Sequence, residues 1–486
     1  MSPLLILGVL IGYFLLLFTI SQITSRNADN ADFFIGSKES PWYLVAFGMI
    51  GASLSGVTFI SVPGWVAGSS FAYMQMVLGY LVGYTFIALV LMPLYYRLNL
   101  TSIYTYLEQR FGTASYKTGA GFFLLSRTIG AAFRLYLVAG VLQYFVFDAY
   151  GIPFIVTVVL TILLIWLYTF KGGIRTIVWT DSLQTFFMLL SVILSIFFIA
   201  KGMNLSIGEV VATVQNSDYS QIFFFEDFMG NKNHFVKQFL SGAMIAVVMT
   251  GLDQDMMQKN LSCRNIGDAQ KNMFTMSLSL IFVNLLFLGL GALLYIYAAH
   301  LGVEPSKADH LFPLIALEHL PIYAGIIFLL GLIAAAYSSA DSALTSLTTS
   351  FCVDFLDFEK HPEKASQSTR FGVHIGFSVI LAIVIWLFSQ IGDDSVIVNI
   401  FKAAGYTYGP LLGLYAFGLF TNLKIKDNLA PLICIISPII CFYLNKYSAT
   451  LLGGYQFGFE LLILNGLLTF AGLLLISNGT QKTKTT

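Results

Sequence analysis

The sequence predicts an all-α polytopic membrane protein, and three observations support that prediction. Of the 486 residues, 57% are hydrophobic and 10% are charged, whereas a soluble protein has about 25% charged residues. Apolar segments long enough to cross a bilayer, at about 20 residues each, recur along almost the whole chain. Lysine and arginine gather in alternate connections between these segments, which is typical of cytoplasmic loops. Little of the sequence remains for a soluble domain.

The apolar pattern predicts about thirteen membrane-spanning helices. We expect them at 3–22, 43–68, 72–97, 119–147, 151–169, 178–201, 236–258, 273–299, 321–350, 372–391, 396–421, 428–446 and 457–476. Basic residues of the alternate connections place the N-terminus outside and the C-terminus in the cytoplasm. These residues are Arg26, Lys38, Arg97, Arg110, Lys117, Lys171, Arg175, Lys259, Arg264, Lys271, Lys360, Lys364, Arg370, Lys424, Lys426, Lys482 and Lys484. We therefore expect a multi-pass protein of the inner (cytoplasmic) membrane.

Composition and motifs argue against several classes of function. The formal net charge is zero and no basic cluster is present, so nucleic acid is not an expected partner. The four cysteines, Cys263, Cys352, Cys434 and Cys441, show no metal-binding spacing. Neither an HExxH nor a Walker A sequence occurs, and the absence of the latter argues against an ATP-driven pump. We also find no nucleophile–base constellation, so the sequence does not predict an enzyme.

The segment 321–350 differs from a lipid-facing helix. Ala335, Ser338, Ser339 and Ser342 follow one another at i, i+3, i+4 and i+7, so they form one stripe on a helix. Asp341 lies beside the stripe, and an ionisable group at membrane depth is a candidate functional residue. The stripe can be read in two ways, as a face for close helix packing or as an oxygen-rich binding site.

The segment 43–68 is rich in small residues. Its middle contains Gly48, Gly51, Ser53, Ser55 and Gly56. This composition favours a helix that is broken inside the membrane, where freed carbonyls can bind a cation and helix ends can bind substrate. The alternative is a tightly packed helix that is only kinked at its proline.

Several charged residues fall inside predicted spans. Arg127 and Arg134 are seven residues apart and share a helix face. Arg134 is too deep to snorkel, so it requires a carboxylate of the protein or of a substrate. Asp181 could cap its helix, ligate a cation or pair with either arginine. Asp253 and Asp255 are interpreted as part of a solvated helix end.

Four motifs make the chain resemble the sodium:solute symporter family, which includes the sodium–glucose cotransporters and the bacterial sialic acid and proline symporters. They are SGVTFISVP at 55–63, GGIRTIVWTDSLQ at 172–184, DQDMMQKNL at 253–261 and AAAYSSADSALTSLTTSFCVD at 334–354. YTYGPLLGLYAFGLF at 406–420 is also similar. The resemblance extends over about residues 1–425.

The resemblance implies a leucine-transporter-type fold, with two inverted five-helix repeats whose first helices are broken at the midplane. The expected boundaries are 1–42 for an extra helix and cytoplasmic loop, 43–201 for the first repeat, 202–235 for an extracytoplasmic loop, 236–421 for the second repeat, 422–476 for two C-terminal helices and 477–486 for a disordered tail.

The resemblance also implies sodium sites. In the main site, the ligands would be the carbonyls of Gly51, Leu54 and Ala335 and the hydroxyls of Ser338 and Ser339. Oxygen-only ligands suit a hard cation. A second sodium site, present in some members, would fall on Asp181, Ser338, Asp341 and Ser342. Asp341 stands where the sialic acid symporters have serine, so the number of sodium ions stays open.

The substrate would lie near Ser53, Ser55 and Thr58, facing Arg134. The carboxylate-binding arginine of the sialic acid symporters aligns with Gly130, one turn before Arg134 on the same face. An anionic substrate such as a sugar acid is therefore an expectation of the resemblance.

Together, these observations predict a monomeric, sodium-coupled secondary active symporter that imports a small organic solute across the lipid bilayer by alternating access. The coupling ion is Na⁺. Two alternatives remain: a proton-coupled symporter of a sugar or other neutral solute, with Asp341 or Asp181 as the proton carrier, and a solute sensor or channel with the same fold.

Overall fold

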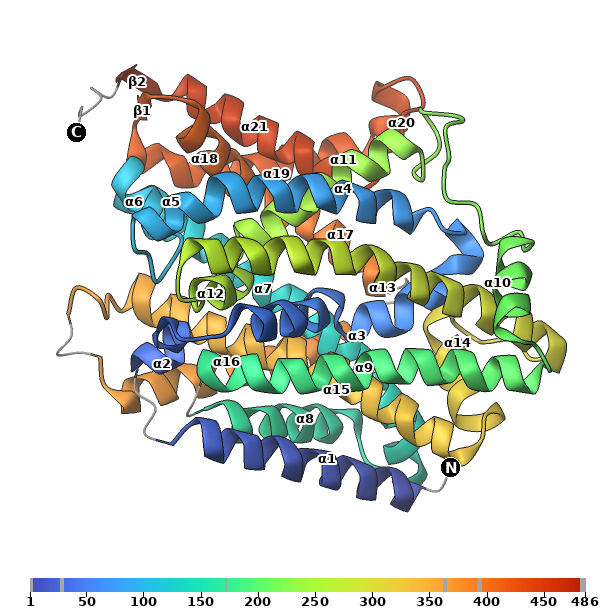
Figure 1. Cartoon of the computed structure of the whole chain (residues 1–486). Coiled ribbons are helices and arrows are strands. Elements are labelled where there is room, and N and C mark those ends of the chain that lie inside the picture. The colour runs from blue at the N-terminus through green and yellow to red at the C-terminus, as the bar shows by residue number, and fades with distance from the viewer. Residues whose placement is uncertain (1–2, 27–29, 171–172, 362–364, 391–395, 481–486) are drawn as a thin grey trace.

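The computed structural model describes residues 3–26, 30–170, 173–361, 365–390 and 396–480. Long helices lie side by side and run between the two ends of one bundle (Figure 1). The first helix begins at one end, and the last strand lies at the other. Residues 171, 172, 364 and 481–486, which include four of the basic residues used to predict orientation and most of the predicted tail, lie outside the described part.

The helices of the first half of the chain are α1 (Pro3–Thr24), α2 (Asn30–Ile35), α3 (Trp42–Ser69), α4 (Tyr73–Phe86), α5 (Met92–Arg97), α6 (Thr105–Arg110), α7 (Thr113–Leu142), α8 (Phe154–Thr169), α9 (Ile174–Gly202) and α10 (Ile207–Gln215). Those of the second half are α11 (Phe235–Ala246), α12 (Gln254–Leu261), α13 (Ile266–Leu301), α14 (Leu311–Leu314), α15 (Ile322–Ser350), α16 (Gln367–Phe388), α17 (Val396–Thr407), α18 (Gly409–Phe420), α19 (Ala430–Lys446), α20 (Ser448–Leu451) and α21 (Leu461–Leu475). Two short strands are β1 (Leu423–Ile425) and β2 (Ser477–Thr480).

The expected number of spans agrees with the structure. Within the described residues, nine helices are long and apolar enough to cross a membrane, and the bent pair of α11 and α12 supplies a tenth. Three shorter apolar helices, α8, α18 and α21, match the remaining predicted segments. The prediction of a polytopic helical protein with about thirteen spans is therefore confirmed.

Burial separates central helices from peripheral ones. In α3, 89% of the residues of an 18-residue apolar stretch are buried, and in the span that contains α15 the buried share is 72%. In α1 the buried share is 28%, and in the span that contains α19 it is 22%. A helix that is enclosed on all sides has no lipid-facing stripe. Figure 1 shows α1 and α21 at opposite edges of the bundle, with α3 between them. The stretches rich in glycine and serine therefore form the centre of the molecule.

The first helix of each predicted repeat is broken. In α3, Ser55 has φ 59° and ψ 174°, which no helix allows, whereas Pro63 stays within the helix. Between α11 and α12 the chain bends by 64°. The carboxylate of Asp253 at this bend accepts hydrogen bonds from Asp255 N (3.0 Å) and Met256 N (3.4 Å), so it caps α12. The predicted break in 43–68 is confirmed, and the bend lies at a glycine–leucine–aspartate turn.

The prediction of a disordered tail is wrong for residues 477–480, which form β2. This strand pairs antiparallel with β1, joining Leu423 to Thr480 and Ile425 to Ser477. The polar composition suggested a solvated coil, but the backbone of β1 supplies hydrogen-bond partners that local composition does not reveal.

Candidate functional site

The site is built around the break in α3. Ser55 has non-helical backbone angles inside α3, and a break of this kind can free carbonyls of the preceding turn, which contains Gly51 and Leu54. The Ser55 hydroxyl accepts a hydrogen bond from Val57 N at 3.3 Å, which helps to hold this strained conformation. Gly51, Leu54, Ser55 and Val57 are all buried, so the break is enclosed within the protein.

Glycines let two other helices approach this break. A Cβ atom added at Gly48 would lie 2.9 Å from Asp181 Cβ in α9, and one at Gly51 would lie 2.1 Å from Thr185 Oγ1. One at Gly56 would lie 3.3 Å from Ala336 Cα in α15. Only a residue without a side chain allows such close backbone packing. The stripe of small residues in α15 and the carboxylate of α9 are thereby brought to the α3 break.

A cluster of buried polar groups joins α8, α9 and α15. Ser338 Oγ donates to Asp181 Oδ1 at 2.7 Å, and Ser342 Oγ donates to the Ser338 carbonyl at 2.9 Å. Asp341 accepts from Ser342 N at 2.5 Å and from the Tyr168 hydroxyl at 2.8 Å. The exposed fraction of each of these five residues is 1% or less. We call this group the carboxylate cluster.

Beside the cluster, the buried Ser339 hydroxyl has no hydrogen-bond partner among the described residues. Because buried polar groups are usually satisfied, an unpartnered hydroxyl at this position is a candidate ligand. Ser338, Ser339 and Ala335 share one stripe of α15 and are buried, and α15 as a helix packs against α3. Their neutral oxygens, with the carbonyls of the α3 break, fit a hard monovalent cation.

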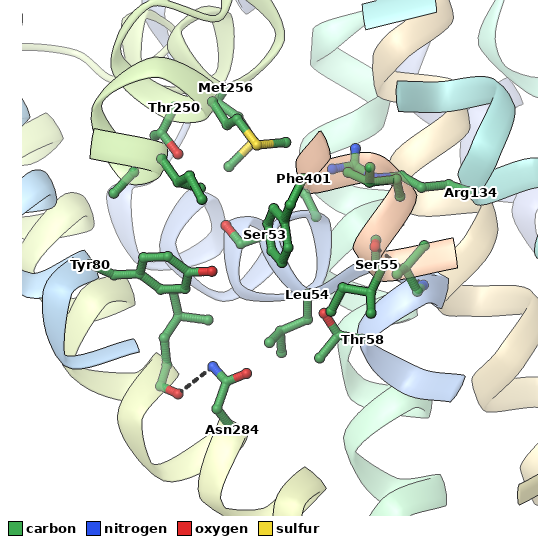
Figure 2. A pocket seen from close by; sticks show the side chains of 18 of the residues that line it. Ser53, Leu54, Ser55, Thr58, Tyr80, Arg134, Thr250, Met256, Asn284 and Phe401 are labelled. Atoms are coloured by element: carbon green, nitrogen blue, oxygen red, sulfur yellow. Dashed lines mark hydrogen bonds between the residues drawn. The ribbon is translucent and has the colours of Figure 1, made fainter. Parts of the chain in front are cut away.

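An adjoining cavity of about 80 Å³ is lined by residues from both halves of the chain. Figure 2 shows Arg134 and Ser55 on one side and Tyr80 and Asn284 on the other. The lining residues are Ala52, Ser53, Leu54, Ser55, Val57, Thr58, Tyr73, Tyr80, Tyr84, Arg127, Arg134, Ile245, Ala246, Met249, Thr250, Met256, Leu280, Asn284, Ile397, Ile400 and Phe401. The four residues expected to bind substrate, Ser53, Ser55, Thr58 and Arg134, all belong to this lining.

Of the two arginines that line the cavity, Arg134 makes no ion pair with a described residue, whereas Arg127 pairs with Asp255. The Arg134 side chain is 8% exposed, and neither Nε nor Nη1 has a hydrogen-bond partner among the described residues. Of the two expectations for this residue, a structural ion pair and a substrate contact, the structure gives no ion pair within the described chain. A guanidinium presents a planar fork of donors that matches a carboxylate.

The comparison with known families decides what kind of protein this is. Residues 33–426 match the sodium:solute symporter family. The chain belongs to that family. As a member it is a multi-pass membrane transporter and not an enzyme, and it is a symporter with Na⁺ as the coupling ion.

Relatives and solved structures agree with this assignment. The symporter is 25% identical to the sodium/sialic acid symporter NanT of Aliivibrio fischeri, over 82% of this chain and 78% of the relative. It is 25% identical to the sodium/sialic acid symporter SiaT of Proteus mirabilis, over 91% and 90%. The human sodium/iodide cotransporter is 26% identical, over 80% and 61%.

The fold resembles that of a substrate-bound, outward-open Na⁺-coupled sialic acid symporter, with a TM-score of 0.82 at 21% identity over 97% of each chain. It also resembles closed Mhp1, a transporter of the nucleobase-cation-symport-1 family, with a TM-score of 0.56 at 14% identity over 92% of this chain and 94% of Mhp1. These likenesses confirm the leucine-transporter-type fold.

The symporter pairs its buried charges differently from the sequence expectation. Of the three possibilities for Asp181, which were a helix cap, a cation ligand and a pair with Arg127 or Arg134, the pairing differs in the structure. Asp181 Oδ2 lies 2.6 Å from Lys259 Nζ. Arg127 pairs with Asp255 instead. Lys259 had been counted as a loop charge because it follows an apolar segment, yet its side chain is 1% exposed. Its position within the buried 253–261 motif was the available signal.

The helix end at α12 is not solvated, which corrects another expectation. Asp253, Asp255 and Gln258 are fully buried. Besides capping α12, Asp253 accepts a hydrogen bond from the Tyr408 hydroxyl at 2.5 Å. Gln258 donates to Thr349 Oγ1 at 2.9 Å. Polar residues at the end of an apolar segment resemble a solvated terminus, but here the bend turns α12 into the protein, where other side chains satisfy them.

Proposed function

We propose that the symporter takes up a small organic anion, recognised through its carboxylate, together with sodium. The observation that supports this most directly is the guanidinium of Arg134, which lines the cavity without a partner for Nε or Nη1 among the described residues. A buried guanidinium without a hydrogen-bonded carboxylate is costly, so a substrate anion would be stabilised there. The hydroxyls of Ser53, Ser55 and Thr58 would add hydrogen bonds to the same ligand.

We assign sodium to the α3 break. The carbonyls of Gly51, Leu54 and Ala335 and the hydroxyls of Ser338 and Ser339 would ligate it, and the unpartnered Ser339 hydroxyl supports this assignment. Because Leu54 also lines the cavity, an ion at the break would order the same turn that contacts substrate. Binding of the ion and of the solute would then favour each other, which is the condition for coupled transport.

Similarity to named relatives agrees with an anionic solute. The relatives include sialic acid symporters, and sodium-coupled monocarboxylate transporters at 23–26% identity. A cavity of about 80 Å³ favours the smaller end of this range of acids in the conformation described. We infer a short carboxylate, with a sugar acid requiring side-chain movement.

Topology completes the proposal. The inverted repeats would be 43–201 and 236–421, with the N-terminus outside and the C-terminus in the cytoplasm of a cell whose inner membrane holds the protein. The opposite ends of the bundle at which the chain begins and ends are consistent with this orientation (Figure 1). All proposed ligands come from one chain, so a monomer would suffice.

Uptake into proteoliposomes tests this function. With an inward sodium gradient, we expect saturable accumulation of a radiolabelled short carboxylate and none of its amide analogue. Arg134→Gln should abolish accumulation while leaving sodium-dependent thermal stabilisation intact. Arg264→Gln removes an exposed arginine and serves as the matched control. Equal uptake of acid and amide, or full activity of Arg134→Gln, would contradict an anionic substrate.

A further inference from the structure

A lysine fills the carboxylate cluster where a second cation would be expected. Lys259 Nζ lies 2.6 Å from Asp181 Oδ2, and both side chains are 1% exposed. The other oxygen of Asp181 accepts from Ser338 Oγ at 2.7 Å. Both oxygens of this carboxylate therefore already have donors from the protein, so an additional ion at Asp181 would compete with the ammonium of Lys259.

We propose that Lys259 is a tethered cation that takes the place of a second sodium ion, so that the symporter couples one sodium ion to each substrate. The proposal rests on the proposed function, because it concerns the number of ions bound at the α3 break and the carboxylate cluster. The second sodium site would otherwise be formed by Asp181, Ser338, Asp341 and Ser342. In the proposal, the ammonium of Lys259 takes the position of the ion there.

Counting charges leads to the same number of ions. The described cluster contains the ammonium of Lys259 and the carboxylates of Asp181 and Asp341, so with both carboxylates ionised it carries an excess of one negative charge. Nearby, Arg127 and Asp255 neutralise each other. An uncompensated charge away from water is strongly unfavourable. One monovalent cation brings the cluster to neutrality, whereas two would leave an excess positive charge.

The place for that single ion adjoins the cluster. Ser338 donates to Asp181 and also belongs to the proposed sodium ligands, so an ion held by Ser338 and Ser339 lies next to the negative charge that it neutralises. A second ion at Asp181 would have to displace Lys259 and leave its ammonium buried without a counter-ion. A sodium ion can diffuse away, but the lysine remains attached to α12.

Lys259 also connects the ion site to the substrate cavity. It belongs to α12, which carries Met256 in the cavity lining and Asp255 in the pair with Arg127, another lining residue. Since α12 is a single short helix, movement of Lys259 relative to Asp181 would shift Met256 and Asp255 with it. The charge that replaces the second ion is therefore fixed to a helix that lines the cavity.

The test counts sodium ions in purified protein and in proteoliposomes. In equilibrium binding with ²²Na⁺, we expect one ion per wild-type protein and two for Lys259→Met, whose cluster carries two excess negative charges. Lys259→Arg keeps the charge and should bind one. The double variant Lys259→Met/Asp181→Asn restores an excess of one and should also bind one. This series separates loss of charge from loss of packing.

Flux provides a second readout in the wild type. At zero membrane potential and a tenfold sodium gradient, coupling to one ion balances an approximately tenfold substrate gradient, and coupling to two ions balances about a hundredfold gradient. We expect the former. Two bound ions in the wild type, a hundredfold balance point, or a single ion in a folded Lys259→Met protein would overturn the proposal. If Lys259→Met does not fold, the wild-type counts decide.

The measured number of sodium ions distinguishes the role of Lys259 from sodium coupling itself. Two sodium ions per wild-type protein would leave sodium coupling intact and remove the role of Lys259. Absence of sodium binding, or uptake driven by a proton gradient without sodium, would instead remove the sodium site at the α3 break.

Discussion

Removing the Ser339 hydroxyl should weaken sodium binding without weakening the fold. In the described structure this hydroxyl has no hydrogen-bond partner, so Ser339→Ala breaks no interaction within the chain. Its effect on the unfolding free energy without sodium should stay within about 0.5 kcal/mol. The contrasting variant is Ser338→Ala, which removes the 2.7 Å hydrogen bond that the Ser338 hydroxyl donates to the buried carboxylate of Asp181. That loss should cost about 1.5–3 kcal/mol even without the ion.

The size of the sodium effect follows from the number of ligands lost. A hydroxyl that contacts an ion contributes on the scale of a hydrogen bond to a charged group, about 1.5–3 kcal/mol. At about 1.4 kcal/mol per factor of ten, Ser339→Ala should raise the sodium dissociation constant by about 10- to 150-fold. Ser346→Ala is the matched control, since Ser346 is buried in the same helix and bonds to Ala343 O at 3.0 Å.

The assay is thermal unfolding of purified protein during a sodium titration, with choline replacing sodium to keep ionic strength constant. Stabilisation by a ligand that binds the native state grows with its concentration relative to its dissociation constant. A shifted sodium midpoint for Ser339→Ala, with an unchanged midpoint for Ser346→Ala, is expected. An unchanged sodium midpoint in Ser339→Ala would refute the assignment of this hydroxyl as a ligand.

Two further substitutions test the packing that positions the site. Arg127→Gln leaves Asp255 buried without its partner, so it should lower the unfolding free energy by about 3–5 kcal/mol, as measured by chemical denaturation. Adding Asp255→Asn in the same chain should recover part of that loss. Gly51→Ala would place a Cβ 2.1 Å from a neighbouring hydroxyl and should cost about 1–3 kcal/mol, whereas Gly140→Ala, with no described atom within 4 Å of its Cβ, should be neutral in the same assay.

Local sequence patterns predicted the membrane spans, the broken helix α3 and the polar face of α15. Length and apolarity were enough to place the spans, because a bilayer requires a minimum run of apolar residues. The small residues around Ser55 predicted a broken helix, since few side chains there could face lipid. The spacing of Ser338 and Ser339 predicted one face of α15, because helical periodicity fixes which residues share a face.

The partners across that face could not be predicted in the same way. Lys259 and Asp181 are 78 residues apart, and Arg127 and Asp255 are 128 apart. Periodicity shows which face a residue occupies but not which helix lies opposite. Lys259 also follows an apolar segment, so a bend that carries it back into the protein was indistinguishable from an exit into the cytoplasm. Strand β2 was missed for a related reason, since its partner lies in a distant segment.

Reciprocal binding of sodium and substrate tests the central claim most directly. Calorimetry would measure the affinity of the symporter for a short carboxylate with and without saturating sodium, and the affinity for sodium with and without that carboxylate. Sodium and carboxylate should each raise the affinity for the other by the same factor, as linkage requires. A carboxylate that binds equally well with and without sodium would contradict the account.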